Sequence, residues 1–184
     1  MHLSPIENPS SSWLKLAYKA SAKRFGKVIG PLKVIYARKP GLMVLALHIQ
    51  RTMEHGLTLE PSLRRLVQTQ AARQNGCTFC EDITLAEAVR QRIGTEKFAA
   101  LAEYRTSPVF TERERAALAF VEEATVHRSV SAETVAALRA HFSDVEIVEL
   151  TWLNAAENYF NLQAAVLGIE SDGLAALASA HRKD

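Results

Sequence analysis

The sequence has few cysteines, no long apolar run and no dense cluster of basic residues, and each absence excludes a class of protein. Two cysteines in 184 residues are too few for the disulfide framework of a small secreted domain. The longest apolar stretch, residues 41–47, is far shorter than the ~20 residues that cross a bilayer. Lysine and arginine are interspersed with acidic residues, whereas a nucleic-acid-binding surface shows clustered basic side chains. We therefore expect a protein that binds neither membranes nor nucleic acids.

The first residues also lack the pattern of a secretion signal. The segment Met1–Pro5 has no cationic start followed by an apolar run. Together with the two cysteines, this pattern predicts cytoplasmic localisation. Apolar residues make up 48% of the chain and charged residues 23%, which is the balance of a globular protein. We expect one domain over residues 1–184, with an irregular Ser- and Pro-rich arm at residues 1–11.

Strand signals are nearly absent, and helical signals cover most of the chain. Apolar residues recur at helical spacing between breaks that contain glycine, proline or asparagine. The pattern predicts an all-α protein, an orthogonal helical bundle. The predicted helices cover about residues 13–27, 42–54, 61–74, 77–93, a short helix from 95, a helix from 112, 132–141, 144–167 and 173–182.

Several helix starts have specific sequence signals. Thr111–Glu114 and Ser143–Glu146 each fit a capping box, in which the side chains at both ends satisfy free amides of the first turn. Pro61 fits the first turn of its helix. In the first predicted helix the apolar face is expected to consist of Trp13, Leu16, Ala17 and Ala20.

Cys77 and Cys80 form a Cys-x-x-Cys pair between the Asn75-Gly76 break and the predicted helix 77–93. A helix N-terminus carries a partial positive charge, which favours the thiolate over the thiol. Residues three apart share one helical face, so the two sulfurs can close an intramolecular disulfide. The pair therefore predicts reversible dithiol chemistry, in which one cysteine attacks a substrate and the other resolves the product.

Other interpretations of the pair remain open. The cysteines can be buried structural residues, or they can be half of a zinc site. Zinc takes about four ligands, usually with a second pair at close spacing. The available histidines, His48, His55, His127 and His141, do not form such a pair. We expect no metal and no cofactor. A thioredoxin-like site would follow a strand, and no strand is predicted here.

The cysteine motif and its surroundings resemble the alkylhydroperoxidase D-like group, or carboxymuconolactone decarboxylase family. The resemblance rests on residues 63–67, on residues 75–82 continuing to Ala86, and on residues 111–120 and 142–150. It extends over about residues 57–170. It implies an all-helical fold with Cys-x-x-Cys at a helix start, and a homo-oligomer, because family members commonly associate.

In the redox branch of that family, the resemblance implies that Cys80 attacks a small-molecule peroxide or disulfide and that Cys77 resolves the product. A dithiol electron donor of unknown identity then reduces the pair. That branch also has a glutamate twelve residues before the first cysteine and a histidine four residues after the second. Here these positions hold Arg65 and Thr84, which cannot act as a carboxylate base or an imidazole proton carrier. The decarboxylase branch generally lacks the cysteine pair, so its name implies no activity for this chain.

Glu157 is a candidate replacement for the missing proton relay. It lies within the apolar stripe of the predicted helix 144–167, with Asn154, Asn158 and Asn161 beside it. Burial would raise the pKa of this carboxyl group and make it a plausible general base. The alternative is a structural pair with an arginine at a contact between helices or subunits.

Two further residues have open roles. Asp82 is either a local acid or base, or a first-turn carboxylate that the helix dipole stabilises. Arg65 either favours a cysteine thiolate and attracts an anionic substrate, or is a solvated arginine beside Arg64.

Three functions are compatible with these features. The favoured one is a dithiol peroxidase or disulfide reductase, an antioxidant enzyme that uses Cys80 and Cys77. The second is a non-enzymatic homo-oligomer whose cysteines are redox sensors or inert. The third is a decarboxylase-like enzyme or hydrolase that acts through Glu157. The apolar stretches 43–47 and 152–160 favour self-association in each case.

Overall fold

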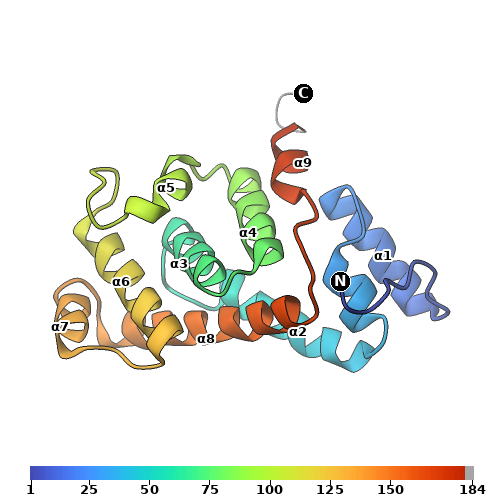
Figure 1. The fold of residues 1–184 in the computed structure, drawn as a ribbon, viewed down its shortest axis with the longest axis horizontal. Helices are drawn as coiled ribbons and strands as arrows, with labels where there is room; N and C mark the ends of the chain where they lie inside the picture. Colours follow the sequence, from blue (N-terminus) through green and yellow to red (C-terminus); the bar gives the residue numbers. More distant parts are fainter. Residues whose placement is uncertain (181–184) are drawn as a thin grey trace.

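The computed structural model, which describes residues 1–180, is a bundle of helices without a strand in that range (Figure 1). The predicted all-α fold is therefore confirmed. The helical elements are α1 (Ser12–Phe25), the π-helical turn η1 (Leu32–Tyr36), α2 (Pro40–His55), α3 (Pro61–Gln74), α4 (Thr78–Arg90), α5 (Glu96–Ala99), the 3-10 turn η2 (Leu101–Glu103), α6 (Glu112–His127), α7 (Ala132–His141), α8 (Asp144–Val166) and α9 (Leu174–Ala180).

The helices start where local sequence chemistry favours a start. Thr111 and Ser143 accept the predicted capping-box hydrogen bonds at α6 and α8, and both boxes are complete. Ser131 caps α7 in the same way, through the amide of Thr134. Pro61 occupies the first turn of α3, where its missing amide hydrogen costs no hydrogen bond.

Helix α3 lies at the centre of the bundle (Figure 1). Every residue from Leu63 to Ala72 is buried, because α4, α6 and α8 pack around it. Its apolar residues Leu63, Val67 and Ala71 belong to the main core with residues of α6 and α8. A helix enclosed on all sides also buries its polar residues, and this places Arg65 and Gln68 inside the protein.

Helices α1 and α2 and the turn η1 form a second layer beside the bundle. Tyr18, Tyr36 and Met43 make a small core there, against which Phe160 of α8 packs. The predicted inner face of α1 is wrong: Leu14, Tyr18 and Ser21 are buried, whereas Trp13 and Leu16 are exposed. Because α1 carries apolar residues on two stripes, only docking against η1 and α2 decides which stripe is buried.

Other differences from the predicted elements are local. The turn η1 was not predicted, and α4 ends at Arg90 rather than near residue 93. The last helix, predicted over residues 173–182, is observed from Leu174 to Ala180, and residues 181 and 182 lie outside the described part. Residues 1–11 contain no regular element. Among the described helices, none combines the length and the hydropathy needed to cross a bilayer.

Candidate active site

The two cysteines lie at a tight junction between α3 and α4. After α3 ends, Gly76 adopts a φ of +63°, a left-handed conformation that residues with a Cβ atom rarely adopt. The amide of Cys77 then donates to the carbonyl of Ala72 at 2.9 Å, which closes the C-terminus of α3. Cys77 is therefore the N-cap of α4, and Cys80 lies in the first turn.

Cys77 and Cys80 are joined by a disulfide, as the Cys-x-x-Cys spacing predicted. The amide of Cys80 donates to Sγ of Cys77 at 3.2 Å, so the N-terminal end of α4 points at the Cys77 sulfur. In the reduced protein this contact and the helix dipole favour a thiolate at Cys77. Both cysteines are only 3% exposed, so reagents reach them only through an internal space.

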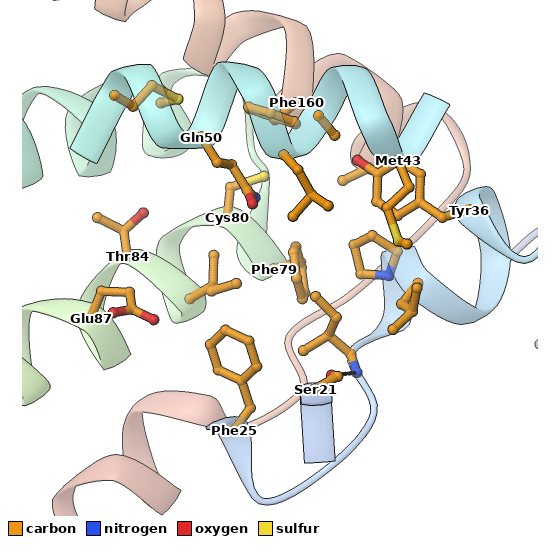
Figure 2. A pocket seen from close by; sticks show the side chains of 18 of the residues that line it. Ser21, Phe25, Tyr36, Met43, Gln50, Phe79, Cys80, Thr84, Glu87 and Phe160 are labelled. Carbon is orange, nitrogen blue, oxygen red and sulfur yellow. Dashed lines mark hydrogen bonds between the residues drawn. The ribbon is translucent and has the colours of Figure 1, made fainter. Parts of the chain in front are cut away.

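That space is a cavity of about 680 Å³ in which Cys80, and not Cys77, forms part of the wall. Its volume lies within the ~300–1,000 Å³ usual for small-molecule sites. Figure 2 shows Phe79 and Phe160 around the same opening as Cys80. The cavity separates the α1, η1 and α2 layer from α4 and α8. Its apolar and aromatic wall consists mainly of Phe25, Ile29, Ile35, Tyr36, Met43, Phe79, Ile83 and Phe160.

Glu157 forms a polar part of the same cavity, and it is almost completely buried. Its carboxylate oxygens accept hydrogen bonds from Asn161 at 2.7 Å and from Gln68 at 3.3 Å. Burial raises the pKa of Glu157 to about 7, although the two amides and the nearby Arg65 guanidinium favour the charged form. Near neutral pH this carboxyl group therefore gives up or takes a proton easily. Within residues 1–180 it forms no ion pair with an arginine.

Arg65 is buried, with 5% of its surface exposed, so its interpretation as a solvated arginine is wrong. Its Nη2 donates to both carboxylate oxygens of Glu54 of α2, at 2.6 and 2.5 Å. Arg65 also donates to Gln68 at 2.8 Å and to Gln91 at 3.4 Å. Arg65 also lines the cavity that Cys80 borders, so its attraction of a thiolate or an anionic substrate there stays a prediction. Through its bond to Gln68, which in turn binds Glu157, Arg65 also helps to position that carboxylate.

Thr84, at the position of the family histidine, is buried and lines the cavity one helical turn beyond Cys80 (Figure 2). Asp82 lies on another side of α4 and points away from the cavity. Its carboxylate accepts hydrogen bonds from the amides of Asp172, Leu174 and Ala175 at 2.9 to 3.1 Å. These bonds satisfy free amides at the start of α9. The structure thus gives Asp82 a capping role, and its role as an acid or base stays a prediction.

An asparagine network links Glu157 to the turn that carries the cysteines, and the sequence did not reveal this link. Asn75 donates to Asn161 at 3.0 Å and to Asn158 at 2.9 Å, and Asn161 donates to Glu157. The i, i+4 and i+7 spacing of the α8 asparagines was the only available signal. Across residues 1–180, no group of three or more His, Cys, Asp or Glu side chains is placed to hold a metal ion.

Residues 45–123 match the model of the carboxymuconolactone decarboxylase family. The uncharacterized protein YnjA of Escherichia coli (strain K12) is 29% identical over 154 residues, which cover 83% of this chain and 84% of YnjA.

Several solved structures share the fold, including the following two. A protein of unknown function from Agrobacterium tumefaciens, whose description names the antioxidant defence protein AhpD, is 29% identical with a TM-score of 0.70. The match covers 75% of this chain and 96% of that protein. An uncharacterized peroxidase-related protein from Silicibacter sp. TM1040 has a TM-score of 0.80 at 19% identity, with 95% and 93% of the two chains covered.

Proposed function

The chain belongs to the carboxymuconolactone decarboxylase family, in its alkylhydroperoxidase D-like group, and on this basis we propose that it is a dithiol peroxidase. The observation that carries the proposal is the asymmetry of the cysteine pair. Cys80 lines the cavity, whereas Cys77 lies behind it as the N-cap of α4. A substrate in the cavity therefore meets Cys80 first, and Cys77 remains available to resolve the product.

The proposed reaction starts from the reduced pair. The Cys80 thiolate attacks the terminal oxygen of an organic hydroperoxide, so that an S–O bond forms and the O–O bond breaks. Cys80 becomes a sulfenic acid, and the released alkoxide takes a proton and leaves as an alcohol. Cys77 then attacks Sγ of Cys80, which gives the disulfide and one water molecule. An external dithiol reduces the disulfide to two thiols and is itself oxidised.

Cys77 is well placed for the resolving step. Its sulfur already accepts the amide of Cys80, and the helix dipole lowers the free energy of its thiolate. The sulfenic acid would form only three residues away in the same helical turn. The N-cap position of Cys77 thus favours formation of the disulfide before the sulfenic acid of Cys80 is oxidised further.

Glu157 is the proposed proton donor to the departing alkoxide. In this role Glu157 takes the place of the family glutamate and histidine. The positions of those two residues hold Arg65 and Thr84 in this chain. A carboxyl group with a pKa of about 7 is protonated in about half of the molecules at neutral pH, which suits general acid catalysis. Gln68 and Asn161 fix its two oxygens, and Arg65 positions Gln68. Arg65 thus acts as a positioning residue for Gln68 and Glu157.

The cavity wall favours an organic substrate over hydrogen peroxide. Phe79, Phe160 and Met43 surround the approach to Cys80, and such a wall gains free energy by removing an apolar group from water. Hydrogen peroxide has no apolar surface and gains nothing from these contacts. We therefore expect a lower KM for an aromatic hydroperoxide, such as cumene hydroperoxide, than for hydrogen peroxide.

A peroxide-consumption assay with dithiothreitol as reductant tests the proposal. The wild-type protein should consume cumene hydroperoxide catalytically, and Cys80→Ser should abolish turnover. Glu157→Gln should lower kcat by about 10²-fold or more, the scale of general acid–base assistance. Glu133→Gln, an exposed residue of α7, is the matched control and should leave turnover unchanged. Turnover that survives in Cys80→Ser would overturn the proposal.

A further inference from the structure

Thr84 of α4 places a buried hydroxyl group at the cavity, and this hydroxyl has no hydrogen-bond partner within residues 1–180. The residue is only 4% exposed, and it forms part of the cavity wall. Figure 2 shows its hydroxyl oxygen on the side where Cys80 and Gln50 lie. A hydroxyl that is buried without a partner loses the hydrogen bonds that it made with water, so such groups are uncommon in folded proteins. An unpartnered hydroxyl in this position therefore indicates a partner in another state of the protein.

The other threonines within the described helices all use their hydroxyl groups. A helical threonine often donates to the backbone carbonyl four residues earlier, as Thr69 does to Arg65 at 2.8 Å. Thr84 could make the same bond to the carbonyl of Cys80, but it does not. The threonines whose hydroxyl takes part in a hydrogen bond are Thr52, Thr69, Thr78, Thr125, Thr134 and Thr151. Thr84 is thus the exception among them, and it is the one beside the reactive cysteine.

Cys80 requires a hydrogen-bond donor once the disulfide is reduced. The amide of Cys80 donates to Sγ of Cys77, whereas Sγ of Cys80 accepts no hydrogen bond within residues 1–180. Cys80 is buried in a mainly apolar wall, and apolar surroundings raise the pKa of a thiol. In the disulfide, Sγ of Cys80 carries no negative charge. A thiolate at Cys80 therefore creates a demand for a donor that exists only in the reduced protein.

Thr84 is the donor best placed for this sulfur. Residues four apart on a helix are neighbours on one face, with Cβ atoms about 5 to 6 Å apart, so the hydroxyl of Thr84 lies within reach of Cys80 after a side-chain rotation. Gln50 and Gln163 also line the cavity, but they are not buried, so water satisfies their amides. The Tyr36 hydroxyl belongs to the layer of α1, η1 and α2, on the opposite wall.

We propose that the Thr84 hydroxyl donates a hydrogen bond to the Cys80 thiolate in the reduced protein, and that it thereby directs attack on the peroxide to Cys80. The second half of this proposal rests on the proposed peroxidase function, and the hydrogen bond does not. Thr84 keeps its proton throughout, so it is not a proton carrier. It lowers the free energy of the thiolate through a charge-assisted hydrogen bond. When the disulfide forms again, the sulfur loses its charge and the hydroxyl loses its partner, which is the state of this structure.

The pH dependence of Cys80 alkylation tests the hydrogen bond without any peroxide. In a Cys77→Ser parent protein, Cys80 is the one cysteine that reacts with iodoacetamide, and the midpoint of its rate against pH reports the thiol pKa. Thr84→Val keeps the shape of the side chain but removes the hydroxyl. Loss of one hydrogen bond to the thiolate should raise the midpoint by about one pH unit. Thr84→Ser retains a hydroxyl and should give a midpoint close to that of the parent.

The controls separate the hydroxyl from its surroundings. Thr151→Val removes a hydroxyl from an exposed position on α8 and should leave the midpoint unchanged. The other charged or titratable groups of the cavity are the same in all variants, so their effects on the thiol cancel in the comparison. These groups are Arg24, Tyr36, Arg51, Glu54, His55, Arg65, Glu87 and Glu157. An unchanged midpoint in Thr84→Val, or a midpoint in Thr84→Ser that rises as far as in Thr84→Val, would overturn the proposal.

The redox equilibrium of the cysteine pair provides an independent measurement. The hydrogen bond stabilises only the reduced pair, so Thr84→Val, with both cysteines present, should make the disulfide harder to reduce. Its reduction potential in dithiothreitol redox buffers at pH 8 should therefore be lower than that of the wild-type protein, and an equal or higher potential would contradict the hydrogen bond. Cumene hydroperoxide turnover distinguishes this proposal from the proposed function. A raised midpoint in Thr84→Val without wild-type turnover would support the hydrogen bond and refute the peroxidase, and turnover without a raised midpoint would do the reverse.

Discussion

Replacing Glu157 with glutamine removes a buried ionisable group, and its effect on stability depends on pH in a definite direction. The folded protein raises the pKa of Glu157 to about 7 from an ordinary value of 4.5, chiefly through burial. Between pH 4.5 and about pH 7, Glu157 keeps its proton in the folded protein but has released it in the unfolded protein. The wild-type protein is therefore stabilised by this group at low pH, and it loses that stabilisation as the pH rises through 7.

The magnitude follows from the pKa difference. A shift of one pKa unit corresponds to about 1.4 kcal/mol, so a rise from 4.5 to about 7 corresponds to roughly 3 kcal/mol over the whole range. Between pH 5 and pH 8 the change amounts to about 2 to 3 kcal/mol, because some of the titration lies below pH 5. Glu157→Gln cannot ionise and lacks this dependence. Other titrating groups contribute equally to both proteins and cancel in the comparison.

Urea denaturation of both proteins at pH 5 and pH 8 provides the assay. The free energy of unfolding of the wild-type protein should fall relative to that of Glu157→Gln by about 2 to 3 kcal/mol between these pH values. The amide of glutamine changes the hydrogen bonds with Gln68 and Asn161, but this effect is the same at both pH values. Parallel pH dependences for the two proteins would refute the burial-raised pKa, and with it the proposed proton donor.

Three other substitutions test separate parts of the structure. Thr111→Ala removes the N-cap of α6 and should lower the free energy of unfolding by about 1 kcal/mol in urea denaturation. Asp82→Asn should destabilise the protein by about 1 to 3 kcal/mol through the α9 amides, yet leave peroxide turnover intact. A large loss of turnover in the folded variant would restore its role as an acid or base. Phe160→Ala should raise the KM for cumene hydroperoxide more than for hydrogen peroxide, and equal increases for both would show that the wall does not select organic substrates.

Features that depend on neighbouring residues in the chain were predictable from the sequence. The capping boxes at Thr111 and Ser143 needed only four residues each, and both are present. The Cys-x-x-Cys spacing placed two sulfurs within bonding reach at a helix start, and the disulfide is present. The apolar spacing around Glu157 indicated its burial, because it lies on the same stripe as core residues.

Features that depend on distant residues were not predictable in this way. Arg65 is adjacent to Arg64, and nothing local showed that Glu54 of another helix would pair with it. The carboxylate of Asp82 binds amides about ninety residues away in the chain, so its capping role has no local signal. The turn η1 has no side-chain cap, and it is held by its packing against α1 and α2.

The order of attack by the two cysteines tests the central claim most directly. In the single-cysteine variants Cys77→Ser and Cys80→Ser, no disulfide can trap the first oxidation product. After exposure to one equivalent of cumene hydroperoxide, dimedone labelling and mass spectrometry should find a sulfenic acid on Cys80 in Cys77→Ser. In Cys80→Ser, Cys77 should remain unoxidised, because its side chain does not reach the cavity. Rapid formation of a sulfenic acid on Cys77, with none on Cys80, would contradict the account.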